Sequence, residues 1–293
     1  MMRPSRRSRL VRRVAFRALD YALLLLLAGF FLFPIVFMIV SSFKPEKVIF
    51  DDLKTIVWAF IPRDVTTDNY LRVFERVPFW RYLFSSSFVT ATTVTLGLFV
   101  NSMIAYALSR LRWRGRQFVL SVVISLIIIP LEAIAVPLLM IVNGLPWFGG
   151  ATTWLDSYQV QIVPFIAEAF SIYLFYQFFI GIPKDFDEAA LIDGASRFQI
   201  YLRIIVPLSR PVFATVAILQ ALMLWSSYLW PLMVTRSQTV RPLTIGITAF
   251  YVLDIRWGQI LAFASMVTIP VLVLFIVFQR WFIRSVAASG VKG

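Results

Sequence analysis

The 293-residue sequence contains no cysteine and no histidine. The first absence excludes disulfides, thiol nucleophiles and cysteine metal sites, and the second excludes Ser-His-Asp triads and histidine-ligated metals. Charged residues make up only 15% of the chain, too little polar surface for a soluble enzyme of this apolar content. The ATP-binding pattern G-x-x-x-x-G-K-[ST] is also absent from the sequence. We therefore expect a chain that is not an enzyme and that holds no cofactor or metal of its own.

Apolar residues dominate what is present, at 60% of the chain with 28 phenylalanines and a mean hydropathy of +0.82. Runs of about 20 apolar residues are typical of membrane-spanning helices. The sequence therefore predicts an all-α polytopic membrane protein with six transmembrane helices. The expected spans are Tyr21–Val40, Leu83–Leu108, Phe118–Val142, Tyr158–Ile180, Pro211–Val234 and Gln259–Phe282.

Positive charge indicates the orientation of these spans, because cytoplasmic loops carry an excess of Lys and Arg. The short loop "RLRWRGR" at 110–116 is strongly basic, whereas 143–157 contains neither Lys nor Arg. This asymmetry places both termini in the cytoplasm. The same bias explains the net charge of +13 without a nucleic-acid partner.

One membrane domain is expected, with short tails at both ends. A basic cytoplasmic tail covers 1–20, the membrane domain covers 21–283, and a cytoplasmic tail covers 284–293. The first apolar run is too long for a cleaved signal sequence. Segment 41–81 is predicted to form an ordered outer loop with a short helix near Asn69–Arg76.

A polar segment, "PKDFDEAALIDGASRFQIYLRIIVP", interrupts the apolar pattern at 183–207. Asp185 and Glu188 have the spacing of a capping box, and Ser196 and Gln199 repeat it. Gly194 lies between the two helices that these caps predict, as a helix stop. The sequence therefore predicts a helix-turn-helix on the cytoplasmic side, at 181–208 between the fourth and fifth spans.

The second of these helices carries Phe198, Tyr201, Leu202 and Ile205 at the spacing of one apolar stripe, and Pro207 ends or kinks it. Such a stripe fits a connection lying flat on the bilayer or a docking element for a partner. A DNA-binding helix-turn-helix is a third reading, weakened by the tether to the membrane.

The polar segment resembles the cytoplasmic signature of ABC-importer permeases: E-A-A, three residues, G, nine residues, I, one residue, L-P. Val206 stands here in place of the leucine. The wording "IDGAS", with "AYALSR" at 105–110 and "YLWP" at 228–231, is similar to the carbohydrate-uptake branch, close to the second permease of maltose- and glycerol-phosphate-type systems. The residues that the resemblance assigns to ATPase coupling are Glu188, Ala189, Ala190, Asp193, Gly194, Ile204 and Pro207.

The resemblance implies a permease subunit in the cytoplasmic (inner) membrane of a bacterial-type cell. It would work with a homologous second permease, two ATPase subunits that hold ATP and magnesium, and an extracytoplasmic solute-binding protein. The expected substrate is a sugar or a related polyol, and membrane lipid surrounds the chain.

Two acids, Glu132 and Glu168, fall inside predicted spans, where a carboxylate costs about 3 kcal/mol. They could line the path of the substrate, bind sugar hydroxyls or pair between helices. The alternative function is a proton-coupled secondary transporter or channel that uses both. Pro130 and Pro137 bracket Glu132, so we expect that helix to be broken near mid-membrane.

An aromatic cluster in "LWSSYLWP" places Trp225, Tyr228 and Trp230 around the hydroxyls of Ser226 and Ser227. Aromatic faces stack on sugar rings while hydroxyls bond to them, which makes these residues candidates for the substrate path. The competing interpretation is an aromatic belt at the outer membrane interface.

Overall fold

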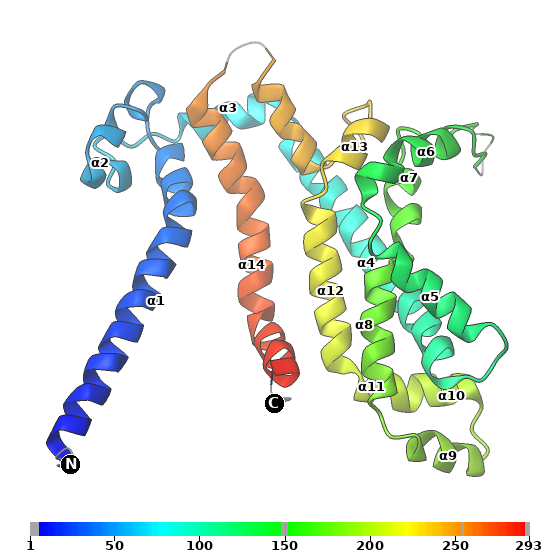
Figure 1. Cartoon of the computed structure of the whole chain (residues 1–293). Helices are drawn as coiled ribbons and strands as arrows, with labels where there is room; N and C mark the ends of the chain where they lie inside the picture. The colour runs from blue at the N-terminus through cyan, green and yellow to red at the C-terminus, as the bar shows by residue number, and fades with distance from the viewer. Residues whose placement is uncertain (1–5, 148–149, 151, 253–254, 291–293) are drawn as a thin grey trace. The chain divides into compact units, whose positions relative to one another are not determined.

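The computed structural model describes residues 6–147, 150, 152–252 and 255–290, and all regular elements within these ranges are helices (Figure 1). The side chains of 6–15, 56, 274 and 277–290 lie outside what it describes, as do parts of both expected tails. The chain divides into two compact units. The first comprises 1–76 and 249–266, and the second comprises 77–248 and 267–293.

The helices of the first unit are α1 Arg6–Ser42, η1 Glu46–Val48, η2 Asp52–Lys54, α2 Ile56–Phe60 and α3 Asp68–Arg76. Those of the second are α4 Phe79–Arg110, α5 Arg116–Leu126, α6 Leu131–Asn143, α7 Gln159–Ile162, η3 Val163–Phe165, α8 Ala169–Ile180, α9 Asp185–Ile192, α10 Arg197–Ile200, the π-helix η4 Tyr201–Ile205, α11 Val206–Leu208, α12 Arg210–Trp225 and α13 Leu229–Val234. Two elements continue from one unit into the other, η5 Leu243–Phe250 and α14 Trp257–Gly290.

The spans are partly as expected. Within the described residues, three helical segments are long and apolar enough to cross a membrane: Phe16–Ser42, Phe79–Arg110 and Gln159–Ile180. Two bent helix pairs raise this number to five if each pair forms one span, namely α5 with α6 at 106° and Arg197–Leu208 with α12 at 79°. The sixth span, in α14, stays a prediction, since the apolar helix assigned there is the shorter Trp257–Val273.

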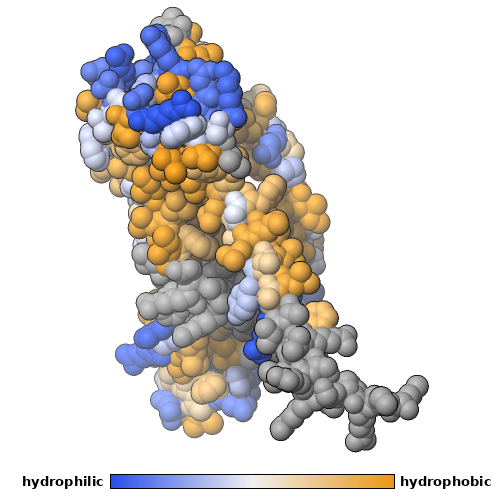
Figure 2. Space-filling view, turned by 90° about the vertical axis from the view of Figure 1, so that its left-hand side faces the viewer, coloured by the Kyte–Doolittle hydropathy of each residue, from blue (hydrophilic) through white to orange (hydrophobic). Residues whose placement is uncertain are grey.

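The first unit exposes most of its apolar helix. Side chains of α1 from Phe16 to Phe33 are exposed, and none in its most apolar window is buried by the chain itself. On the face drawn in Figure 2, hydrophobic side chains cover much of the middle, and hydrophilic side chains gather at the upper end and again at the lower end. Lipid or another protein must cover such a helix.

The predicted outer loop is ordered, and its short helix is confirmed as α3. The Lys44 side chain is fully buried, where its ammonium donates to Trp58 O at 2.7 Å and pairs with Asp52 Oδ2 at 3.2 Å. Asn69 Nδ2 donates to the carbonyl oxygens of Ser42 and Lys44, each at 2.8 Å. Burial of a cation is tolerated here because carbonyl and carboxylate oxygens replace its water.

A carboxylate from this loop also caps α14. Glu46 accepts hydrogen bonds from the backbone N–H groups of Trp257 at 2.8 Å and Gly258 at 2.7 Å, where an acid stabilises a helix N-terminus. Position 258 needs glycine, because an added Cβ would lie 2.5 Å from Asn69 Oδ1.

In the second unit, α4 packs against both α8 and α12 (Figure 1). Gly97 lets α4 approach α12, because a Cβ there would lie 2.7 Å from the Gln220 amide. The Gln220 Nε2 group donates to Phe165 O at 3.2 Å. Small residues permit this kind of close contact between membrane helices, and polar side chains then bond across it.

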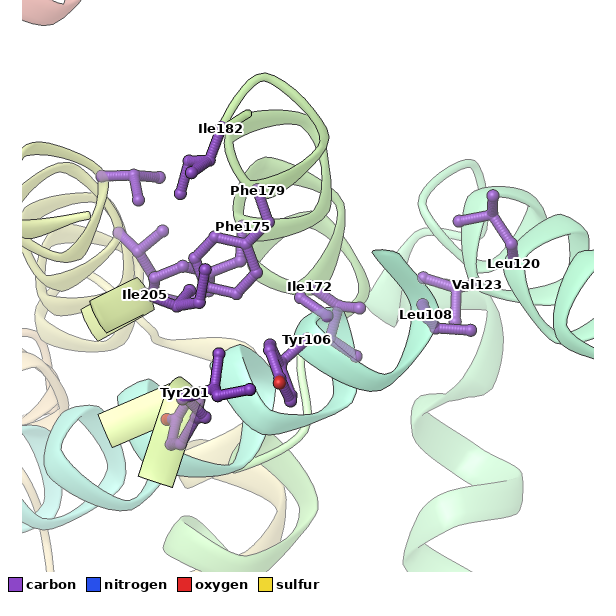
Figure 3. Close-up of a cluster of buried hydrophobic side chains, with 14 of the residues drawn as sticks. Tyr106, Leu108, Leu120, Val123, Ile172, Phe175, Phe179, Ile182, Tyr201 and Ile205 are labelled. Carbon is purple, nitrogen blue, oxygen red and sulfur yellow. The ribbon is translucent and has the colours of Figure 1, made fainter. Parts of the chain in front are cut away.

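A cluster of buried apolar side chains ties the polar segment to these helices (Figure 3). Phe175 and Phe179 of α8 are fully buried and lie beside Ile205 of the π-helix. Tyr106 of α4 and Tyr201 of the π-helix belong to the same cluster, with ring centroids 5.3 Å apart. The polar segment therefore packs as part of the second unit's core.

Candidate functional site

Three interruptions of helices in the second unit border one cavity of about 730 Å³. The chain bends between α5 and α6, leaves helical structure before α8, and leaves it again between α12 and α13. Non-helical backbone at membrane depth is tolerated where it lines a cavity. The polar residues lining this cavity are Ser86, Thr90, Glu132, Gln161, Glu168, Ser226, Ser227 and Tyr228.

Glu168 is the N-cap of α8. Its carboxylate accepts from Phe170 N at 2.9 Å and from Ser171 N at 2.6 Å. Its own backbone N–H donates to Asn101 Oδ1 at 3.0 Å, and Asn101 Nδ2 donates to Ile166 O at 3.0 Å. An acid inside this span thus stabilises a helix that begins there, besides lining the cavity.

Glu132 lies in the first turn of α6, directly after the break at Pro130, so the expected break near this acid is confirmed. Its side chain is exposed on the cavity wall. Among the residues that the structure describes, none donates to its carboxylate. Glu132 and Glu168 therefore differ: one carboxylate is occupied by helix N–H groups, and the other is free to accept from a ligand.

The aromatic cluster does not act as one group. Tyr228 and Trp230 line the cavity, but Trp230 is only 1% exposed and its Nε1 donates to Val160 O at 2.9 Å. Trp225 is buried at the end of α12, where its Nε1 donates to Val267 O at 3.3 Å. It lines a separate apolar cavity of about 360 Å³. Tyr228, which is 42% exposed, is the aromatic side chain of this group most available to a ligand.

The serines lie at the break itself. Ser226 is the C-cap of α12, and its hydroxyl donates back to Leu222 O at 2.6 Å. Ser227 and Tyr228 follow in non-helical conformation, and the Ser227 carbonyl accepts from Thr244 Oγ1 at 2.8 Å. The predicted span Pro211–Val234 is therefore interrupted at Ser226–Tyr228, between α12 and α13, where a threonine hydroxyl replaces a helical N–H as donor to the Ser227 carbonyl.

Three polar lining residues were not predicted from the sequence: Ser86, Thr90 and Gln161. Thr90 and Gln161 are buried, and within the described part of the chain Thr90 Oγ1 and Gln161 Oε1 have no hydrogen-bond partner. Gln161 Nε2 is fixed by Val240 O at 2.9 Å. Buried polar atoms of this kind call for a ligand or water. A glutamine at the start of an apolar span was the available signal.

In the polar segment, α9 and α10 lie on either side of a turn at Gly194, and one predicted cap needs correction. Gly194 adopts a φ of +80°, and Ala195 N donates to Ala190 O at 2.9 Å, which closes α9. The capping box of Ser196 and Gln199 is present at the start of α10. The predicted cap by Asp185 is wrong: α9 begins at Asp185 itself, and Lys184 occupies the cap position without a side-chain bond.

The predicted stripe is also wrong in part. Phe198 and Leu202 are exposed, whereas Ile200, Tyr201 and Ile205 are buried. The π-helix η4 widens the turn, so that residues five apart share a face. Ile200 and Ile205, both fully buried, have this spacing.

The end of α4 holds both helices of the segment. Arg110 Nη1 lies 3.5 Å from Asp187 Oδ2, and Arg110 Nη2 donates to Ile182 O at 2.7 Å. The Tyr201 hydroxyl bonds Ser102 Oγ at 2.7 Å.

The candidate coupling residues are divided between the buried and the exposed surface of the segment. Ala190 is buried and Ile204 is half-buried. The others are exposed: Glu188, Ala189, Asp193, Gly194 and Pro207. Ile192, at the end of α9, is 87% exposed, and Phe186 and Leu191 are exposed beside it. The exposed surface of α9 therefore includes three large apolar side chains.

The comparisons with known proteins agree with this architecture. The family model "Binding-protein-dependent transport system inner membrane component" matches residues 93–288. The chain is 33% identical over 263 residues to the arabinooligosaccharides transport system permease protein AraQ of Halalkalibacterium halodurans, covering 89% of this chain and 91% of the relative. It is 30% identical over 279 residues to the trehalose/maltose permease MalG of Thermococcus litoralis, covering 92% and 94%.

Among solved structures, the chain is similar in fold to one from a bacterial ABC transporter involved in import of the acidic polysaccharide alginate. The TM-score is 0.77 at 24% sequence identity, with 96% of this chain and 100% of the other covered. A second structure of an alginate transporter, in complex with a periplasmic protein bound to an alginate pentasaccharide, gives a TM-score of 0.66 at 16% identity.

Proposed function

Because this chain belongs to the family of binding-protein-dependent transport system inner membrane components, we propose that it lines the path of a neutral sugar in an ATP-driven importer. It is a permease subunit and not an enzyme, and ATP is hydrolysed on a separate chain. This membership favours the ATP-driven permease over the proton-coupled carrier that the two intramembrane acids had suggested.

The composition of the large cavity is the observation that carries the choice of substrate. Its lining includes two glutamates, Glu132 and Glu168, and no Lys or Arg among the described residues. The free carboxylate of Glu132 and the unpartnered Gln161 Oε1 are acceptors for the hydroxyl groups of a sugar. A phosphate or uronate group would instead meet like charge in a medium of low dielectric. The lining therefore favours a neutral sugar or polyol over an acidic one.

The names of the relatives support a sugar. The AraQ and MalG relatives are described as permeases for arabinooligosaccharides and for trehalose and maltose. The structural neighbour takes part in importing an acidic polysaccharide, and its similarity to this chain concerns the fold alone.

The rest of the proposed assembly follows from the exposed surfaces. A homologous second permease would complete the cavity, since Glu132 and Tyr228 are exposed in this chain. An extracytoplasmic solute-binding protein would deliver the sugar. Segment 181–208 would dock on one of two ATPase subunits through Ile192 and its apolar neighbours, with both termini of the chain in the cytoplasm.

Uptake by the reconstituted complex tests this function. The complex, with its solute-binding protein, is given a panel of neutral oligosaccharides, sugar phosphates and uronates, with and without ATP and with an uncoupler. We expect ATP-dependent accumulation of a neutral sugar that the uncoupler does not stop. Accumulation of acidic sugars alone would refute the choice of substrate, and accumulation without ATP would refute the ATP-driven permease.

A further inference from the structure

A second polar cavity, of about 580 Å³, lies at the opposite end of α4 from Phe79. It is bordered by the loop between α4 and α5, by α9 and by Arg197 at the start of α10. Five cations line it, Arg110, Arg112, Arg116, Lys184 and Arg197, against two acids, Asp187 and Glu188. Its charge is opposite to that of the cavity at the helix breaks.

Buried polar atoms in this cavity lack partners. The Arg110 side chain is 2% exposed, and within the described residues its Nε has no hydrogen-bond partner. Asp187 Oδ1 is likewise buried without a partner. The single ion pair between these residues is long, at 3.5 Å. A guanidinium N–H that is buried and unpaired indicates a missing acceptor.

The other cations leave the cavity with excess positive charge. Arg116 Nη1 donates to Leu111 O at 3.3 Å, a neutral acceptor. Arg112, Lys184 and Arg197 form no ion pair with any acid that the structure describes. Arginine guanidinium groups bind phosphate oxygens through paired hydrogen bonds, so this lining fits a phosphate group.

The surroundings of the cavity are those of a membrane interface. Here α4 ends at Arg110 and α5 begins at Arg116, so two apolar helices reach the surface together. Trp113 is 42% exposed and Phe118 is 73% exposed on the same loop and the first turn of α5. Aromatic residues mark the headgroup level, and basic pockets between spans hold anionic headgroups.

We propose that this cavity binds the phosphate group of an anionic phospholipid, held by Arg110, Arg112 and Arg116. A free phosphate would satisfy the same guanidinium groups, but the interfacial position favours the lipid as its source. Because α9 lines the same cavity, the bound headgroup also contacts α9, the helix that ends at Ile192.

The absence of native cysteine makes a direct binding measurement possible. A fluorophore is attached to Gln117→Cys in the full-length chain, beside the cavity and exposed. The labelled chain is placed in nanodiscs of phosphatidylcholine that contain either spin-labelled phosphatidylglycerol or spin-labelled phosphatidylcholine. We expect stronger quenching by the anionic lipid, since its headgroup is held near the fluorophore.

Arginine variants separate a site from diffuse charge. Arg112→Gln and Arg116→Gln are expected to weaken phosphatidylglycerol binding roughly tenfold, the effect of losing one charge-assisted hydrogen bond. Arg114→Gln is the matched control: it removes the same charge from the same loop, but Arg114 does not line the cavity. Equal losses in all three variants, or equal quenching by both lipids, would overturn the proposal.

Radiolabelled inorganic phosphate distinguishes the two sources. In nanodiscs of phosphatidylcholine alone, we expect no binding of radiolabelled phosphate. That result, together with selective quenching by phosphatidylglycerol in the mixed nanodiscs, supports the lipid as the ligand. Phosphate binding that Arg112→Gln abolishes, without lipid selectivity, would keep the anion site but overturn the lipid as its ligand.

Discussion

The contact between Arg110 and Asp187 offers a sharp perturbation, because it joins the end of α4 to α9 through buried side chains that are 2% and 10% exposed. Asp187→Asn leaves the guanidinium buried without its carboxylate. Removing one partner of a buried pair costs 3–5 kcal/mol, and the 3.5 Å separation and the remaining bond to Ile182 O place the expected loss near the lower end, at about 3 kcal/mol. Transport should fall more than ATP hydrolysis, since α9 loses its attachment to the span.

The assay measures thermal unfolding of the assembled complex and the sugar taken up per ATP hydrolysed. Asp185→Asn is the matched control, because Asp185 is exposed in the same turn and should change stability by about 0.5 kcal/mol or less. The double variant Arg110→Gln with Asp187→Asn should recover part of the stability, since no buried charge is left alone. If Asp187→Asn and Asp185→Asn show the same thermal unfolding and the same sugar uptake per ATP, the contact between Arg110 and Asp187 does not attach α9 to α4 as argued.

Three further predictions concern other parts of the molecule. Trp225→Ala should lower stability by about 3–5 kcal/mol through the lost packing of a buried ring. Tyr228→Ala should instead lower uptake per molecule at unchanged stability. The opposite pattern would show that Tyr228 packs and Trp225 contacts the sugar. Burial raises the pKa of Asp156, but hydrogen bonds from Ser237 N and Arg236 N together outweigh it and hold this pKa below its ordinary value of 3.8. Its contribution to stability is therefore present above pH 3.8 and lost as pH falls through the lower folded pKa, and thermal unfolding of Asp156→Asn should lack this acid-dependent step. A cysteine at Thr66 should react with an impermeant thiol reagent from outside the cell, whereas one at Gly115 or Ser196 should react only after permeabilisation; reversed labelling would invert the proposed topology.

The sequence predicts the helical class, the first spans and the turn at Gly194 because each depends on local features. Apolar runs, capping residues and a glycine that adopts positive φ act within a few residues of the chain. The capping box of Ser196 is present for the same reason. The error at Asp185 is small in sequence, a shift of one position, but it removes the predicted side-chain cap.

The helix breaks were harder to predict, because long-range partners decide them. Pro130 predicts one break from the sequence. The break before α8 depends instead on Asn101, which lies on another helix, accepts from Glu168 N and donates to Ile166 O. No sequence pattern predicts the π-helix at Tyr201–Ile205. Its wider turn changes which side chains of the second helix are buried. In the sequence, Trp225 and Tyr228 are equivalent candidates for the substrate path. The structure distinguishes them, because Trp225 is buried and its Nε1 donates to the Val267 carbonyl.

Protection of a single thiol tests most directly whether the cavity at the helix breaks is the sugar path. Ser227→Cys introduces the only thiol of the chain into the cavity lining, and Ser87→Cys introduces one into the separate apolar cavity. Both are placed in the assembled complex and treated with a small thiol reagent, with and without the sugar that the uptake panel identifies and with ATP turnover. The sugar should slow labelling at position 227 and leave position 87 unchanged. Equal labelling rates at position 227 with and without a transported sugar would contradict the assignment of this cavity.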